Sequence, residues 1–149
     1  MPGLLGSIMA EAKSGRGVRV ERPLSPHLTI YAPLINMVMS ILHRLTGAAL
    51  YFGSLLLAWW LIAAAAGPDY FAYVSSQFAT WPGQLVLFGY TWALLHHMVG
   101  GVRHFIWDTG RGLDPATIDL LSWGTIVASA VLTLAVWAFA LGVHGGLSP

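Results

Sequence analysis

The sequence contains no cysteine and very few charged residues. Without cysteine, this chain cannot hold a disulfide bond, a cysteine-ligated iron–sulfur cluster or a covalently attached haem of the CxxCH type. Asp, Glu, Lys and Arg make up 9% of its 149 residues, whereas about 25% is usual in a soluble domain. The net charge of +1 gives no indication of nucleic-acid binding. Hydrophobic residues reach 56%, so the composition indicates an integral membrane protein.

Three apolar runs are each long enough to cross a bilayer as a helix, which takes about 20 residues. The expected spans cover about residues 34–66, 84–107 and 120–143. We interpret Trp81-Pro82-Gly83 as a turn before the second span. The predicted fold is an all-α integral membrane protein with three transmembrane helices. It has an N-terminal arm, residues 1–33, and a transmembrane anchor domain, residues 34–149.

The distribution of basic residues predicts the orientation of the spans. Arg111 lies between the second and third spans, and the other basic residues outside the spans are in the arm: Lys13, Arg16, Arg19 and Arg22. The positive-inside rule therefore places the N-terminus on the cytoplasmic or matrix side. The arm lacks an apolar run of about 7–15 residues, so we expect no cleaved secretory signal. Glu11 and Glu21 argue against a transit peptide, which favours the bacterial inner membrane over the mitochondrial one.

The stretch Leu94–Gly110 places ionisable groups at the end of the second apolar run. It holds three histidines together with Arg103 and Asp108. An arginine or aspartate at the centre of a membrane helix costs roughly 2.5 to 3.5 kcal/mol. Such residues therefore face protein or a bound polar group rather than lipid, and they indicate a functional site.

Helical geometry, at about 100° per residue, gathers the polar residues of the first two spans into stripes. The stripe on the first span consists of Asn36, Ser40, His43, Arg44, Gly47 and Tyr51. The stripe on the second span consists of His97, Gly101, His104 and Asp108. An adjacent strip holds His96, Gly100 and Arg103. We expect the stripes to face protein or a bound polar ligand.

His97 suits the role of a haem axial ligand. It lies near mid-span, its neutral imidazole can coordinate iron, and Gly101 leaves a depression for the porphyrin plane. The haem propionates need cationic or donor partners. The candidates on the same side of the membrane are His43, Arg44, Arg103 and His104. Two alternatives remain open, in which these groups only bond helix to helix or form a proton path.

A haem that only transfers electrons takes two axial ligands, and this chain offers one. His96 points about 100° away from His97, so the two cannot bind one iron. His43 lies near the end of its helix, and we expect it to be too shallow. The second ligand is therefore expected from another chain, which a thin three-span bundle also needs for packing.

Two segments are similar to a known family. RPLSPHLTIYAPLINMVMSILHRLTG, from Arg22 to Gly47, contains the family's Arg-Pro-Leu-Ser-Pro-His and Ser-x-x-His-Arg-x-Thr-Gly. HMVGGVRHFIWDTG, from His97 to Gly110, contains its His-x-x-x-Gly-x-Arg-His followed by Asp-x-Gly. The chain thus resembles the cytochrome b membrane-anchor subunits of succinate dehydrogenase, respiratory complex II. The three-span layout fits as well, so the resemblance covers nearly the whole chain.

The resemblance implies roles for individual positions. His97 matches the ligand of haem b, whose second ligand would come from a smaller anchor subunit. His43 and Arg44 match residues near the propionates, and Ser40 and Arg44 match residues that line the ubiquinone site. This is chemically reasonable, because a quinone carbonyl needs a donor in an apolar slot. A nearby cation also stabilises the negative charge that develops on reduction.

Other residues of the two motifs have less defined roles. Arg103 and His104 are expected in the vicinity of the propionates. Asp108 is expected to pair with Arg103 or Arg111, to help deliver protons to the quinone, or to be a simple helix-end charge. His27 is expected to dock the arm on the iron–sulfur subunit.

The resemblance implies a subunit that anchors succinate dehydrogenase, shares haem b with the second anchor and helps form the ubiquinone-reduction site. The enzyme's active site would lie in the flavoprotein and iron–sulfur partner subunits, from which electrons of succinate pass to the quinone. This would link the tricarboxylic acid cycle to electron transport. The alternatives are an anchor of a fumarate-reducing quinol enzyme and a haem-free structural anchor, and His97 argues against the latter.

Overall fold

The computed structural model describes residues 11–13, 19–21 and 31–146. These ranges contain β1 (Glu11–Lys13), β2 (Arg19–Glu21), α2 (Ile35–Ala66), α3 (Pro68–Ala79), α4 (Trp81–Asp108) and α5 (Pro115–Gly146). The chain divides into two compact units, Met1–Pro33 and Leu34–Pro149. In the first unit, β1 and β2 pair antiparallel with Ala12 opposite Val20. His27 lies outside the described residues.

The helices α2, α4 and α5 are the three predicted spans. Each is long and apolar enough to cross a membrane, and apart from the short β1–β2 pair the regular structure of the described residues is helical, which confirms the prediction of an all-α fold with three transmembrane helices. Within the chain itself the spans bury little surface, at most 17% of the most apolar window of any one of them. Most of their apolar surface therefore faces lipid or another protein chain.

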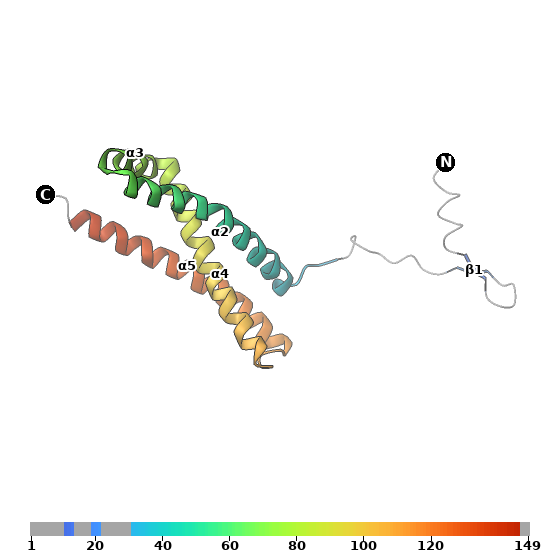
Figure 1. The fold of residues 1–149 in the computed structure, drawn as a ribbon. Coiled ribbons are helices and arrows are strands. Elements are labelled where there is room, and N and C mark those ends of the chain that lie inside the picture. Colours follow the sequence, from blue (N-terminus) through green and yellow to red (C-terminus); the bar gives the residue numbers. More distant parts are fainter. Residues whose placement is uncertain (1–10, 14–18, 22–30, 147–149) are drawn as a thin grey trace. The chain divides into compact units, whose positions relative to one another are not determined.

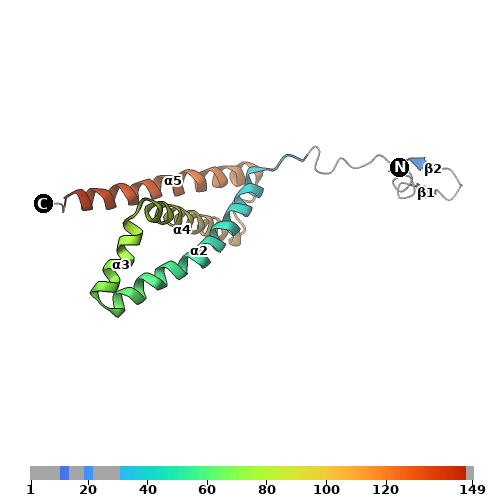
Figure 2. The same cartoon turned by 90° about the horizontal axis from the view of Figure 1, so that it is seen from above.

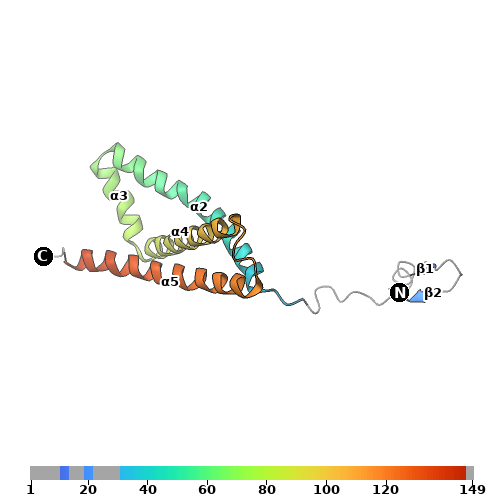
Figure 3. The ribbon, with the colours of Figure 1, turned by 90° about the horizontal axis from the view of Figure 1, so that it is seen from below.

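The helix α3 occupies a segment in which the sequence pattern suggested only a connection. Figures 2 and 3 show α3 bridging the ends of α2 and α4, which diverge from each other toward it. Gly67 ends α2 with a φ of 128°, which favours glycine, and Pro68 then starts α3. Phe71, Val74 and Phe78 have the spacing of one helical face, and Val74 is fully buried.

The second span begins earlier than expected, at Trp81 rather than at Gln84. The prediction of a turn at Trp81-Pro82-Gly83 is therefore wrong. A proline is tolerated in the first helical turn because the backbone N–H there has no partner within the helix. Thr80 caps α4, since its hydroxyl oxygen accepts a hydrogen bond from the backbone N–H of Gly83 at 3.3 Å. This proline starts a helix rather than marking a loop.

The third span also begins earlier than expected, at Pro115 rather than near Leu120. The Asp114 carboxylate caps it by accepting a hydrogen bond from the backbone N–H of Thr117 at 2.9 Å. This bond, assisted by the Thr117 hydroxyl, holds the pKa of Asp114 below its ordinary value. α4 packs against both α2 and α5, as Figure 1 shows. The location of the site therefore depends on which of these two helices each polar side chain of α4 faces.

Candidate functional site

The helices α2 and α4 meet at two histidines. The rings of His43 and His97 lie face to face, with centroids 4.0 Å apart and planes 13° apart. Nδ1–H of His97 donates to the carbonyl oxygen of His43 at 3.1 Å. Nε2–H of His43 donates to the carbonyl oxygen of His97 at 3.2 Å. Because a carbonyl oxygen can only accept, each bond determines which ring nitrogen carries a proton.

The bond to His43 leaves Nε2 of His97 with a free lone pair in the neutral ring. Within residues 31–146, the hydrogen-bond contacts of the His97 ring nitrogens all involve Nδ1, including one of 3.4 Å to the Thr46 hydroxyl. Thr46 is only 3% exposed. A metal-binding histidine commonly donates its other N–H to a carbonyl in this way, which orients the ring. His97 thus has the tautomer and the support of a metal ligand.

Two glycines allow the histidine rings to approach so closely. A Cβ on Gly47 would lie 3.0 Å from Cε1 of His97, and one on Gly100 would lie 2.5 Å from Cδ2 of His43. The sequence pattern instead points to Gly101, where nothing lies within 4 Å of an added Cβ. The roles of Gly47 and Gly100 were missed, although both belong to the predicted polar strips.

The prediction that His43 lies too shallow is wrong, because its ring stacks directly on that of His97. His43 lies eight residues after Ile35, the start of α2, and His97 lies 11 residues before Asp108, the end of α4, so the two histidines are at similar distances from the same end of the helix pair. His43 is nevertheless unsuitable as the second axial ligand. Stacked rings cannot point at one iron from opposite sides, and Nε2 of His43 donates to the His97 carbonyl.

His104 extends the histidine cluster along α4. Its ring lies edge-on to His43, with centroids 5.2 Å apart, and edge-on to Trp107 at 5.3 Å. Ser40 is half-buried and Arg44 is exposed, one turn apart on the same face of α2. The structure thus brings His43 beside His97 and His104 beside His43, and it leaves Ser40 half-buried and Arg44 exposed on α2.

Arg103 faces α5 instead of joining this cluster. Its Nη1–H donates to the hydroxyl of Ser122 at 3.2 Å, and its guanidinium carbon lies 4.9 Å from the centre of the Trp107 ring. The side chain is 3% exposed. Its Nε is buried and has no hydrogen-bond partner in the described part of the chain. The expected place near the propionates stays a prediction.

His96 also belongs to the α4–α5 contact. It is 1% exposed, and its Nδ1 lies 3.2 Å from the hydroxyl of Ser129. Buried hydroxyls line one face of α5, at Ser122, Thr125, Ser129 and Thr133. Each donates to a carbonyl of its own helix, which leaves oxygen lone pairs for α4. The sequence pattern suggested no motif in this span, although the helical spacing of these four residues was visible.

Asp108 is the last residue of α4 and is exposed. Among residues 31–146, no ion pair joins it to Arg103 or Arg111. Arg103 is instead bonded to Ser122. Of the three expectations for Asp108, its position agrees most simply with a charge at the end of a helix, and the proton-delivery role stays a prediction.

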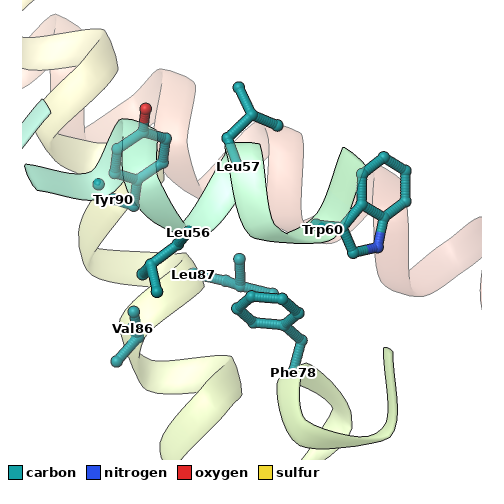
Figure 4. Close-up of a pocket in the computed structure, with 8 residues that line it drawn as sticks. Leu56, Leu57, Trp60, Phe78, Val86, Leu87 and Tyr90 are labelled. Atoms are coloured by element: carbon teal, nitrogen blue, oxygen red, sulfur yellow. The ribbon is translucent and has the colours of Figure 1, made fainter. Parts of the chain in front are cut away.

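A separate apolar pocket of 260 Å³ lies between α2, α3 and α4 (Figure 4). Its lining includes Leu56, Trp60, Phe78, Leu87 and Tyr90. The pocket contains neither Ser40 nor Arg44, so it is distinct from the predicted quinone site. The ring of Tyr90 packs directly on Gly53, where any Cβ would collide with it.

Fold and site together define a multi-pass, helical membrane protein in which one histidine from each of two neighbouring spans stacks on the other and bonds to its backbone carbonyl. Residues 18–136 match the family described as the succinate dehydrogenase/fumarate reductase transmembrane subunit. The chain belongs to this family, which confirms the resemblance seen in the sequence.

Individual relatives agree with the family match. The chain is 41% identical over 122 residues to the succinate dehydrogenase cytochrome b556 subunit of Paracoccus denitrificans, covering 80% of this chain and 94% of that protein. It is 40% identical over 117 residues to the protein of the same name from Rickettsia prowazekii (strain Madrid E), covering 78% and 91%. It is 36% identical over 117 residues to the mitochondrial cytochrome b560 subunit of succinate dehydrogenase from Sus scrofa, covering 76% and 66%.

Proposed function

We propose that the chain is the haem-ligating membrane anchor of a succinate:quinone oxidoreductase in a bacterial inner membrane. The observation that carries this proposal is the fixed tautomer of His97, whose Nδ1–H is bound to the His43 carbonyl so that Nε2 is left as a ligand. The matching relatives, named as cytochrome b subunits of succinate dehydrogenase, support it. Iron–sulfur chemistry belongs to partner subunits, because this chain has no cysteine to ligate a cluster, and flavin chemistry belongs there as well, because the sequence carries no flavin fingerprint.

The residues around His97 fit a haem b. Its imidazole would supply one nitrogen to the iron, and the surface at Gly101 is open enough for a flat group. Among the described residues, no cluster of three or more His, Cys, Asp or Glu could hold a bare metal ion, so a metal bound by His97 would take its other ligands from a porphyrin or a partner. When bound, the haem supplies one-electron redox chemistry beside the quinone site. A second ligand would come from the small anchor subunit, since His43 and His96 are engaged elsewhere.

The propionates are held by groups on the side of α4 that faces α2. His104 of α4 offers a ring nitrogen there and Arg44 of α2 offers a guanidinium, while the His43 ring lies edge-on to His104 with its own Nε2–H bonded to the His97 carbonyl. His104 and Arg44 are better placed than Arg103, whose guanidinium is bonded to Ser122.

Ubiquinone is reduced beside Ser40 and Arg44. The Ser40 hydroxyl donates to a quinone carbonyl, and the Arg44 guanidinium stabilises the negative charge that develops as electrons arrive. The exposed side chains of Ile41 and Leu45 on the same helix provide apolar surroundings. The small anchor and the iron–sulfur subunit complete the pocket, and Asp108 helps to deliver protons.

A reduced-minus-oxidised absorption spectrum of the purified complex tests the haem assignment. We expect a b-type band in the wild-type complex and its loss in His97→Ala, because the change removes the ring that carries Nε2. His96→Ala is the matched control, and it should keep the band because His96 faces α5. A band of full intensity in His97→Ala would refute the assignment.

Two activity assays test the quinone site. Ser40→Ala and Arg44→Ala should lower quinone reduction by about 10-fold or more, as expected for the loss of a donor aimed at developing charge. Succinate oxidation by an artificial dye should remain unchanged, since the dye bypasses the membrane site. An equal loss in both assays would show misassembly and contradict the proposed role.

A further inference from the structure

We propose that a reciprocal lock between α2 and α4 positions the haem ligand. In this lock, the rings of His43 and His97 each bond to the backbone carbonyl of the other histidine and pack on a glycine of the other helix. His43 and Gly100 are thus positioning residues for His97. This inference rests on the proposed haem site. It goes beyond that site by assigning His43 a second task, that of orienting the imidazole of His97, and by assigning a role to two glycines.

The lock has the same two parts on each helix. Each histidine ring donates a hydrogen bond to the backbone carbonyl of the other histidine, at 3.1 and 3.2 Å. Each ring also lies over a glycine of the other helix: His97 over Gly47, and His43 over Gly100. On each helix the glycine follows its histidine by about one turn, which puts both on one face. The motif is therefore nearly symmetric across the contact.

The bonds and the stacking together define the orientation of the His97 ring. The carbonyl of His43 holds Nδ1, and the His43 ring lies flat against one face of the imidazole at 4.0 Å. Gly47 keeps the neighbouring space clear, since a Cβ there would lie 3.0 Å from Cε1 and 3.9 Å from Nε2. Rotation of the ring would break the bond and lose the stacking, so Nε2 keeps one direction.

Gly100 acts on the haem ligand only through His43. An added Cβ at Gly100 would lie 2.5 Å from Cδ2 of His43, so the ring of His43 must move. That movement removes the stacking and weakens the bond to the His97 carbonyl, while Nδ1 of His97 still meets a backbone carbonyl. Gly100→Ala therefore disturbs the orientation of the ligand without touching its ring.

Gly53 provides a matched control for packing at the same pair of helices. The ring of Tyr90 from α4 lies on Gly53 of α2, so an added Cβ would collide there as well, but no histidine is involved. Gly89→Ala is a second control, because a Cβ at that position of α4 meets nothing within 4 Å. Loss of packing and loss of ligand orientation can thus be separated.

The experiment uses the assembled complex with its haem and measures haem content, the reduced absorption band and the low-spin electron paramagnetic resonance of the iron. Gly100→Ala should shift the resonance and the band, and should release haem about 10-fold more readily, the usual effect of losing an outer contact of a ligating histidine. Gly53→Ala should lower thermal stability but leave both spectra at their wild-type positions. Gly89→Ala should change nothing.

A double variant completes the test. In a His43→Ala background, adding Gly100→Ala should cause no further spectral shift, because the ring that it displaces is already gone. Additive shifts, or a Gly100→Ala complex with wild-type spectra and haem retention, would overturn the lock. So would a Gly53→Ala complex with the same shift. If His97→Ala keeps its haem, the haem site itself is wrong. If His97→Ala loses haem while Gly100→Ala stays unshifted, only the lock fails.

Discussion

The two sides of α4 accommodate polar groups within a membrane-spanning segment in different ways. Toward α2, histidine rings stack and bond to backbone carbonyls over glycines. Toward α5, Arg103 and His96 are buried against serine hydroxyls, with exposed fractions of 3% and 1%. The first contact leaves Nε2 of His97 available, whereas the second buries the polar groups of Arg103 and His96.

On this single helix, the side that faces α2 carries the candidate ligand, and the side that faces α5 carries polar groups that hold the two helices together. A half-buried imidazole with a fixed tautomer and a free nitrogen can take a ligand. A guanidinium closed in by Ser122 and the Trp107 ring cannot reach one without leaving its own contacts. Ionisable residues at neighbouring positions of a membrane helix therefore need separate interpretations, according to the helix that each one faces.

The largest effect on the α5 side is expected from Ser122→Leu. Ser122 is fully buried, so the larger side chain overpacks the contact and leaves Nη1 of Arg103 without an acceptor. The two effects together should cost about 3 kcal/mol of stability. The thermal midpoint of the purified complex measures this. The haem spectrum of the complex that remains folded should be unchanged, and a spectral shift without loss of stability would contradict the separation of the two sides.

A smaller effect is expected from Ser129→Ala. This change removes the hydroxyl 3.2 Å from Nδ1 of His96 and leaves a buried ring nitrogen unpaired, at a cost of about 1 to 2 kcal/mol. Denaturant titration of the complex measures the loss. Ala128→Gly, one position away and not aligned with His96, serves as a comparison for small changes in α5. An intact haem spectrum is again expected, and loss of haem in Ser129→Ala would place His96 in the haem site.

The smallest effect is expected at Asp114, on the surface between the spans. Its pKa is lowered in the folded state by the hydrogen bond from the Thr117 backbone, so its stabilising contribution is present above the unfolded pKa. The contribution is lost as the pH falls through the folded pKa. The thermal midpoint of wild type should therefore exceed that of Asp114→Asn near neutral pH and converge with it in acid. Asp119→Asn is the control, and a difference independent of pH would contradict the assigned cause.

The three spans and the family could be predicted because both depend on local features. Apolar length defines a span, and the motif around His97 is contiguous in sequence. The neighbour of each helical face could not be predicted, because periodicity tells which residues share a face and not which helix covers it. Arg103 was therefore grouped with the propionate residues, although it packs against Ser122.

Other misses have similarly physical reasons. The hydroxyls of α5 resemble scattered small residues, because each one bonds to its own backbone and none is charged. The helix α3 is short and amphipathic, and Pro82 suggested a loop where it starts the next helix. The depth of His43 was misjudged because its distance from the start of α2 was not compared with the similar distance of His97 from the end of α4.

The most direct test of the account is an experimental structure of the assembled complex with its haem bound. We predict that Nε2 of His97 is bonded to the haem iron, that Nδ1–H still donates to the His43 carbonyl, and that the opposite axial ligand belongs to another chain. A haem ligated on both sides by other residues, or an Nε2 of His97 that contacts no iron, would contradict the central claim.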